Sequence, residues 1–353
     1  MRALYQGWLG YQNLGDEALF AACVRNMPRI RWQPMPFDEP PPARITRAIA
    51  RNAWTRGAAR LARGPRAMLG GGTIINRTEH WLDQYRMLRR ATRRPVPLFA
   101  PGVADPSFWS GVPGWKDTRA GWRQELAHLP EIGVRGPQSK RLLDEAGLRG
   151  VTVAGDPVIS FHRGRAGSPP PERRTVAVNA GVATGLMWGN EAHVIAGLGA
   201  AVQGLARRGF HVRLFPMWRR DEAVCRDVAR AGGLPDDSVD PLVLDPGAFL
   251  RYLDGFDVVV SFKLHAAVLA AAAGVPFVAI EYQPKVRDFT ESIGWSDLTF
   301  RSDALEACDI ERAVCAISGD LSAYRDRLGT RVEELAESFR AYARRVEDLL
   351  LAS

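Results

Sequence analysis

A lysine and a histidine stand two residues apart at one junction of the sequence. Lys263 and His265 follow the apolar run DVVVSF and precede the small-residue run AAVLAAAAG. The first run is typical of a buried strand and the second of a buried helix, so both residues fall beside the exposed amides of a helix's first turn. A cation and such amides attract anions, and histidine is a general acid near neutral pH. We therefore predict that His265 contacts a ligand; the alternative is a histidine satisfied within the core.

The next strand ends in a second set of polar side chains. It reads PFVAIEY and is followed by QPKVRDF, so Glu281, Tyr282 and Lys285 stand at or just after its C-terminal end. Parallel strands of an open α/β sheet present their carboxyl ends at one edge, where ligands bind. We expect these three residues to line the same site as His265.

Near the N-terminus, a glycine-punctuated loop connects a strand to a helix. The stretch GWLGYQNLGDEALFAA contains Asn13, Gly15 and Asp16 just before or at the expected helix start. Exposed amides at that helix end favour an anion or a polar ligand. We predict that these residues belong to the site; the alternative for Asp16 is an acid that only complements the helix dipole.

Three further segments place candidate residues at strand ends. LGGGTIINR contributes Gly71, Gly72 and Thr73, because successive glycines let a backbone approach a ligand closely or simply form a tight turn. Arg135 in VRGPQS either holds a carboxylate or phosphate through a bidentate contact or pairs with a nearby acid. Asp156 in AGDPV either lines the site or only starts a turn.

Short β-branched runs alternate with amphipathic helical stretches, which is the pattern of an α/β fold with parallel sheets. Strands are expected within residues 2–8, 66–72, 95–102, 131–136, 151–157, 175–181, 211–217, 257–262 and 276–282. Helices are expected at residues 17–26, 139–146, 192–208, 265–273 and 321–350.

These elements fall into two domains. The stretch HRGRAGSPPPERR, with three consecutive prolines, interrupts both kinds of structure and marks a linker. We predict an N-terminal α/β domain at 1–163 on the acceptor side, a linker at 164–174, a C-terminal α/β domain at 175–330 on the donor side and a terminal helix at 331–353. Two Rossmann-like domains of this kind face a cleft at the carboxyl ends of their strands.

The composition, 46% hydrophobic and 24% charged, is that of an ordinary globular chain. No stretch resembles a signal peptide or a membrane span, and four scattered cysteines lack metal-ligand spacing, so we expect a cytoplasmic protein without a metal. The formal net charge is +8, and the densest basic run spans residues 43–66. We expect that run to be either a solvated helix face or a surface that contacts anionic lipid, at the inner face of the membrane, or a lipid-linked substrate. No nucleic-acid-reading motif accompanies the charge, so we expect no nucleic-acid partner.

Several motifs, in their order along the chain, resemble the polysaccharide pyruvyl transferase family. They are GYQNLGDEAL, LGGGTII, VRGPQS, AGDPVI and FKLHAAVLAAAAGVPFVAIEYQPKV. The resemblance implies a glycosyltransferase-B-type fold that uses no sugar-nucleotide donor. It implies transfer of a pyruvyl group from phosphoenolpyruvate, with no cofactor, to two hydroxyls of a sugar. That sugar belongs to a polysaccharide, a lipid-linked glycan precursor or a glycosylated metabolite.

The same resemblance implies roles for individual residues. His265 is the expected general acid, and Asp16 is the expected acid or base for a hydroxyl of the acceptor. The residues expected on the donor side are Lys263, Leu264, Arg135, Lys285 and Asn179.

Two positions depart from the family's pattern. The family commonly has arginine where this chain has Lys263, and often has a basic residue after the strand that here ends at Asn179 and Ala180. Lysine lacks the planar fork that grips a carboxylate or phosphate at two points. Three alternatives therefore stay open: a divergent relative that transfers another group, a glycosyltransferase with a nucleotide-sugar donor, and a non-catalytic carbohydrate-binding relative.

Overall fold

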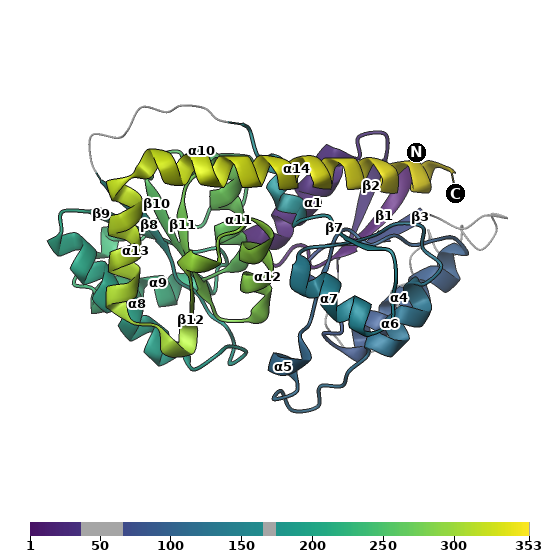
Figure 1. Cartoon of the computed structure of the whole chain (residues 1–353), viewed down its shortest axis with the longest axis horizontal. Helices are drawn as coiled ribbons and strands as arrows, with labels where there is room; N and C mark the ends of the chain where they lie inside the picture. The colour runs from purple at the N-terminus through teal and green to yellow at the C-terminus, as the bar shows by residue number, and fades with distance from the viewer. Residues whose placement is uncertain (37–65, 165–173, 353) are drawn as a thin grey trace. The chain divides into compact units, whose positions relative to one another are not determined.

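The computed structural model describes residues 1–36, 66–164 and 174–352, and the chain forms two units (Figure 1). The N-terminal unit comprises Met1–Tyr11, Leu19–Pro157 and Ser338–Ser353, and the C-terminal unit comprises Gln12–Ala18 and Val158–Glu337. The chain leaves the N-terminal unit close to the predicted boundary at 163. The basic run at 43–66 and the linker at 164–174 lie, except for their end residues, outside the described residues.

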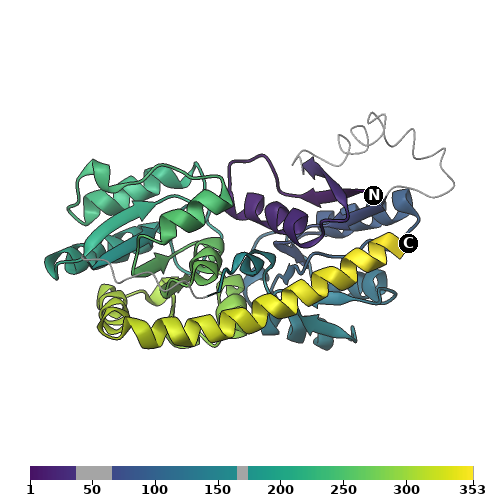
Figure 2. The same ribbon diagram turned by 90° about the horizontal axis from the view of Figure 1, so that it is seen from above.

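Two segments group differently from the predicted domains, and both belong to helices. Helix α1 (Leu14–Asn26) begins in the C-terminal unit, so Asp16 belongs to the same unit as His265 and not to the N-terminal domain. Helix α14 (Leu321–Ala352), yellow in Figure 2, begins at residue 321, ahead of the predicted terminal helix at 331–353, and its residues from 338 onward belong to the N-terminal unit.

The N-terminal unit contains short parallel sheets. Strands β1 (Arg2–Gly7), β2 (Arg31–Pro36) and β3 (Arg66–Leu69) pair in the order β2-β1-β3. Strand β4 (Thr73–Ile75) pairs with β5 (Gly102–Val103), and β6 (Ile132–Val134) pairs with β7 (Val151–Val153). A parallel bridge between Leu69 and Leu98 continues the pairing beyond β3. Within each of these sheets the strands are parallel, so their carboxyl ends lie at one edge of that sheet.

Helices bury the apolar side of these strands. They are α4 (Glu79–Thr92), α6 (Arg119–Leu126) and α7 (Pro137–Glu145), whereas the four-residue α5 (Pro106–Trp109) follows β5 outside this core cluster. In α4, Trp81, Tyr85 and Leu88 recur at helical spacing and are buried in the core. At the end of α14, the hydroxyl of Tyr342 donates to the carbonyl of Leu98 at 2.6 Å, which fastens this helix to the same core.

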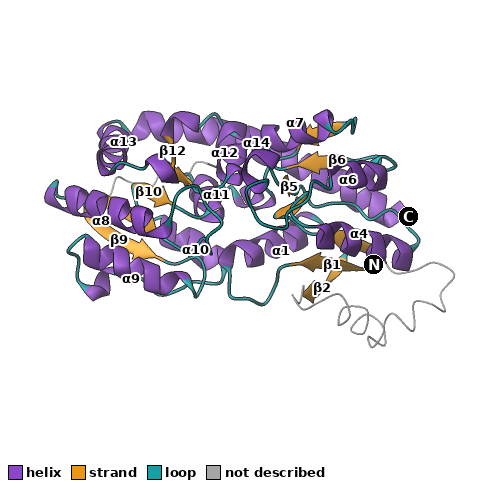
Figure 3. Cartoon of the chain, turned by 90° about the horizontal axis from the view of Figure 1, so that it is seen from below, coloured by secondary structure: helices purple, strands orange, loops and turns teal. Residues whose placement is uncertain are grey.

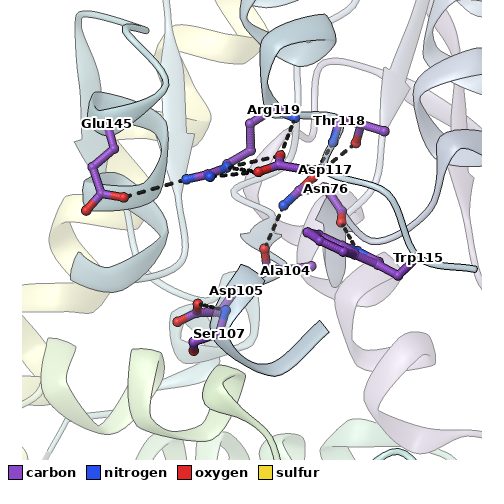
Figure 4. A network of polar contacts seen from close by, with 9 residues as sticks. All are labelled: Asn76, Ala104, Asp105, Ser107, Trp115, Asp117, Thr118, Arg119 and Glu145. Atoms are coloured by element: carbon purple, nitrogen blue, oxygen red, sulfur yellow. Dashed lines mark hydrogen bonds and ion pairs between the residues drawn. The ribbon is translucent and has the colours of Figure 1, made fainter. Parts of the chain in front are cut away.

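One buried asparagine organises the loop around α5 (Figure 4). Asn76 has a φ of 62°, a left-handed conformation that asparagine tolerates better than most residues. Its Nδ2 donates to the carbonyl of Ala104 at 3.0 Å, and its Oδ1 accepts from the backbone nitrogen of Thr118 at 2.6 Å. The indole nitrogen of Trp115 donates to the Asn76 carbonyl at 2.9 Å. Asn76 therefore fixes both ends of residues 104–118 at the carboxyl side of the strands.

The C-terminal unit is one five-stranded parallel sheet between two helix layers (Figure 3). Its strands are β8 (Thr175–Asn179), β9 (His211–Phe215), β10 (Val258–Ser261), β11 (Phe277–Glu281) and β12 (Thr299–Arg301), in the order β12-β11-β10-β8-β9. Helices α8 (Glu191–Arg207), α9 (Asp221–Ala231) and α13 (Ala307–Gly319) pack together, and α10 (Pro246–Leu253), α11 (Leu264–Ala273) and α12 (Pro284–Ser292) form the other group. The parallel, helix-covered sheets confirm the predicted α/β class with two Rossmann-like domains.

The strand order locates the place where a ligand is expected. Counted from β8, the spatial order is 2-1-3-4-5, the doubly wound order in which the chain reverses direction between the first and third strands. Ligands in such sheets bind outside the carboxyl ends of those two strands. Here the first of them ends at Asn179, and the other ends at Ser261, just before Lys263 and His265. No helix in the described ranges is long and apolar enough to cross a membrane.

Candidate functional site

His265 lies in the first turn of α11 and touches the start of another helix. A β-carbon placed on Gly15 would lie 2.2 Å from Nδ1 of His265, so the glycine backbone and the imidazole are in direct contact. The residue as a whole is half-buried, so part of it is exposed, although its Nε2 is buried. His265 is therefore not sealed within the core.

The segment that carries Gly15 is held to the C-terminal unit by backbone contacts. The backbone nitrogen of Leu14 donates to the carbonyl of Met217 at 2.9 Å, and Asn13 forms a bridge with Trp218. The Asn13 side chain accepts from the backbone nitrogen of Gly15 at 3.0 Å, as a helix-capping residue does. The first turn of α1, with half-buried Asp16, therefore meets the first turn of α11 at His265. Two helix N-termini with their amides thus adjoin one imidazole, which favours a negatively charged ligand.

Lys263 occupies the N-cap position of the same helix α11 without a side-chain capping hydrogen bond, and its ammonium binds other groups of the protein. Nζ lies 3.3 Å from Oδ1 of Asp221, donates to the carbonyl of Val182 and stands 5.7 Å from the ring centroid of Trp218. Only 16% of the side chain is exposed. The structure thus gives Lys263 a set of internal partners that the sequence did not predict.

Asp221, the partner of Lys263, is fully buried at the start of α9. Its Oδ1 also accepts from the backbone nitrogen of Val182 at 2.9 Å. Burial raises the pKa of the Asp221 carboxyl, and the Lys263 ammonium opposes part of that rise. A β-carbon on Gly181 would lie 2.4 Å from Cε of Lys263 and 2.7 Å from Cγ of Asp221, so glycine is needed there for the pair to form.

Asn179 is the last residue of β8, has no exposed surface and bonds to the end of β9 and the start of α11. Its Oδ1 accepts from the backbone nitrogen of Lys263 at 2.8 Å, and its Nδ2 donates to the carbonyl of Phe215 at 3.0 Å. Direct contact between this side chain and a donor does not fit its burial. Both its oxygen and its nitrogen are already hydrogen-bonded to backbone atoms. Asn179 instead fixes where the first turn of α11 begins.

The residues after β11 lie at the same sheet edge and differ in exposure. Glu281 is buried and accepts from Nε of Arg287 at 2.6 Å, and burial raises its pKa against the effect of that hydrogen bond. Tyr282 is buried and stacks on Phe262. Lys285 is half-buried, in the first turn of α12, with Nζ 4.8 Å from the Tyr282 ring centroid. Of the three, Lys285 keeps the most surface for a ligand.

The other predicted residues belong to the N-terminal unit. Arg135 and Asp156 are fully buried, with Nε of Arg135 3.0 Å from Oδ2 of Asp156. Thus Arg135 pairs with a nearby acid, as one of the two predicted alternatives states, and Asp156 does not line an open site. Nη1 of Arg135 donates to the hydroxyl of Thr73 at 3.2 Å. Gly71 and Gly72 are half-buried, and Gly72 has a φ of 99°.

The structure therefore divides the predicted residues into two sets. The C-terminal unit brings together Asn13, Gly15, Asp16, Asn179, Lys263, Leu264, His265, Glu281, Tyr282 and Lys285, and the N-terminal unit holds the rest.

Sequence reasoning missed Asp221, Gly181 and Trp218. The sequence signal for Asp221 was an acid at a helix start directly after a strand and two arginines. Within the described residues, no group of three or more His, Cys, Asp or Glu side chains is placed to hold a metal ion.

Comparison with known proteins identifies the family. A model of the polysaccharide pyruvyl transferase family matches residues 13–284, which include both segments that meet at His265. The chain belongs to the polysaccharide pyruvyl transferase family. Membership makes the protein a transferase by family and confirms the resemblance found in the motifs. No curated protein matches the sequence significantly.

Solved structures show the same fold at low sequence identity. The UDP-GlcNAc 2-epimerase of Neisseria meningitidis, bound to UDP-GlcNAc, has 11% identity and a TM-score of 0.64 over 100% of both chains. MnaA of S. aureus, solved with UDP, has 11% identity and a TM-score of 0.62 over 93% of this chain and 90% of that one. WaaG, a glycosyltransferase involved in lipopolysaccharide biosynthesis, has 8% identity and a TM-score of 0.55 over 100% of both. These similarities confirm the glycosyltransferase-B-type fold.

Proposed function

We propose that this family member transfers the pyruvyl group of phosphoenolpyruvate to two hydroxyls of a sugar acceptor. The observation that carries the proposal is the contact between Gly15 and His265, because it joins two segments within the range that the family model matches, NLGDEA and KLHAA, at a sheet's switch point. The imidazole of His265 then stands beside the first turn of α1, which carries the carboxylate of Asp16. The acceptor is a sugar of a polysaccharide, a glycan precursor or a glycosylated metabolite.

The reaction needs one proton donor and one proton acceptor. His265 delivers a proton to the vinyl carbon of phosphoenolpyruvate, which becomes the methyl group of the product. One sugar hydroxyl adds to the neighbouring carbon, and the second displaces phosphate by breaking the carbon–oxygen bond to it. Asp16 takes the proton of the first attacking hydroxyl, and the proton of the second leaves with the phosphate. Asp16 and His265 regain their starting protonation states by exchange with solvent. The products are the pyruvyl ketal and inorganic phosphate, so no further cofactor is required.

The donor brings a phosphate and a carboxylate, and both need positive partners. The first-turn amides of α11, including that of Leu264, and the half-buried Lys285 at the start of α12 meet this need on adjacent strand ends. Both helices follow neighbouring strands, β10 and β11, of one sheet. The proposed donor site therefore lies on the C-terminal unit.

The test is a donor screen followed by a turnover assay. Purified protein is expected to be stabilised against thermal unfolding by phosphoenolpyruvate, because a ligand that binds only the folded state raises its melting temperature. With a suitable hexoside, phosphate is expected to appear in step with loss of acceptor. Stabilisation by a nucleotide-sugar alone would favour a glycosyltransferase, and stabilisation by sugar alone would favour a non-catalytic relative.

A glycine substitution tests the contact on which the proposal depends. Gly15→Ala is expected to lower pyruvyl transfer by about 10-fold or more, because the added methyl group would lie 2.2 Å from Nδ1 and 2.7 Å from Cγ of His265. The ring must move, since these atoms are close to the backbone. Crowding of this kind costs about 1–3 kcal/mol of stability, which thermal unfolding measures.

The matched control is Gly329→Ala, another helical glycine. A β-carbon there meets no atom within 4 Å, and residue 329 lies within α14. This control is expected to keep full turnover and to gain about 0.5–1 kcal/mol of stability from the better helix propensity of alanine. Full turnover of Gly15→Ala would contradict the role given to the contact.

A further inference from the structure

We infer that Lys263 is a positioning residue, which keeps the first turns of α1 and α11 in place around His265. It does not contact the donor anion directly. This inference rests on the proposed function, since it concerns how the same site is kept in order. It differs from the role that the family resemblance implies for this position. Three independent contacts of the lysine side chain support it.

The first step is the charge balance around the ammonium. Nζ of Lys263 lies 3.3 Å from the carboxylate of Asp221, which is fully buried, and it also donates to the carbonyl of Val182. A buried carboxylate without a cationic partner is strongly unfavourable, so the ammonium is expected to stay paired with Asp221. Its positive charge is therefore largely cancelled before a donor arrives.

The second step is the shape of the slot. Gly181 lies against both members of the pair, where a β-carbon would stand 2.4 Å from Cε of Lys263. The lysine methylenes thus occupy a close-fitting passage between the turn after β8 and the start of α9. A side chain held in this way is less free to turn towards a ligand, because its departure would leave the buried Asp221 carboxylate without its cationic partner.

The third step is the route from the ammonium to His265. The ring of Trp218 faces Nζ of Lys263 at 5.7 Å, within the range of a cation–π contact. Trp218 forms a backbone bridge with Asn13, whose side chain caps the turn that places Gly15 against His265. The backbone of Lys263 occupies the N-cap position of α11, two residues before His265. One residue is therefore linked to both helix starts, to α1 through its side chain on Trp218 and to α11 through its backbone.

The test combines kinetics with a double-mutant cycle. Lys263→Met and Asp221→Asn are each expected to lower kcat by about 10-fold or more and to change the KM for phosphoenolpyruvate by less than about 3-fold. Each single variant is expected to lower the melting temperature by at least about 5 °C. The double variant is expected to be little worse than either single one, because the two residues form one unit.

Lys285→Met is the contrasting variant. Lys285 lies at the same sheet edge but is not a member of the Lys263–Asp221 pair. The proposed function assigns it to binding the donor anion. Its loss is expected to raise the KM for phosphoenolpyruvate with little change in melting temperature. If Lys263→Met instead raised that KM and left kcat unchanged, Lys263 would be a donor contact and the inference would be overturned.

A readout that needs no turnover separates this inference from the proposed function. The imidazole proton resonances of His265, assigned by their loss in His265→Gln, are expected to shift in Lys263→Met and in Asp221→Asn. A fall in melting temperature with unmoved His265 resonances would show a merely structural pair and overturn the inference. If the wild-type protein transferred no pyruvyl group, the proposed function would fail, whereas the resonances and the stability cycle would still decide the inference.

Discussion

Replacing His265 by glutamine is expected to lower the rate of pyruvyl transfer by about 10²–10⁴-fold, which is the usual contribution of a general acid. Glutamine keeps the size and a hydrogen-bonding end but has no proton to give at neutral pH. The residue is half-buried and its side chain is in contact with Gly15, so the exchange leaves no large cavity. The melting temperature is therefore expected to change by no more than about 2 °C. A phosphate-release assay and a thermal scan measure the two quantities.

The matched control is His193→Gln. His193 is an exposed histidine in the first turn of α8, a helix of the same unit. It shares the residue type and the helix position of His265 without the contact to α1, so its loss is expected to leave turnover unchanged. Unfolding of His265→Gln would support the core-histidine alternative. Turnover within about 3-fold of wild type would exclude His265 as the general acid.

The main elements of the C-terminal unit could be predicted because their local signals agree with the fold. The expected strand within 257–262 and helix at 265–273 appear as β10 (Val258–Ser261) and α11 (Leu264–Ala273). Long β-branched runs next to small-residue helices leave little choice of structure, since both faces must be buried. For the same reason, the placement of His265 at a strand-to-helix junction is confirmed.

The edge strands were missed for a physical reason. Strand β2 contains Pro34 and Pro36, which argue against a strand when only the sequence is read. In the structure β2 is at the edge of its sheet, where a missing backbone donor is tolerated. Strands β4 and β12 have three residues each and are too short for an alternating pattern. Their existence depends on neighbours that lie far away along the chain.

Side-chain pairing was the other feature that the sequence could not provide. Lys263 was expected on the donor side, yet its partner Asp221 stands 42 residues earlier, at the start of α9. Likewise, Asn179 was expected to contact a donor, whereas its amide joins β8 to the start of α11. Spacing along the chain indicates which residues reach a sheet edge. It does not tell whether they pair with each other there or remain available to a ligand.

Removing one charge of the Arg135–Asp156 pair has the largest expected effect on stability. In Asp156→Ala the free energy of unfolding is expected to fall by about 3–5 kcal/mol, because the guanidinium stays buried after its carboxylate partner is lost. Both side chains have 0% exposure, and Nε of Arg135 lies 3.0 Å from Oδ2 of Asp156. Gly102 leaves room for the guanidinium, since a β-carbon on this residue would lie 2.6 Å from Nη1 of Arg135. Denaturant unfolding measures the loss.

A second variant tells whether the loss comes from the uncompensated charge. In Arg135→Met/Asp156→Ala neither charge remains, so most of the lost stability is expected to return. Glu79→Ala serves as the surface control, because the Lys116–Glu79 pair is 67% and 57% exposed and such pairs contribute little. If Asp156→Ala cost less than about 1 kcal/mol, water would have to reach the guanidinium, and Arg135 would then be accessible to an anionic ligand after all.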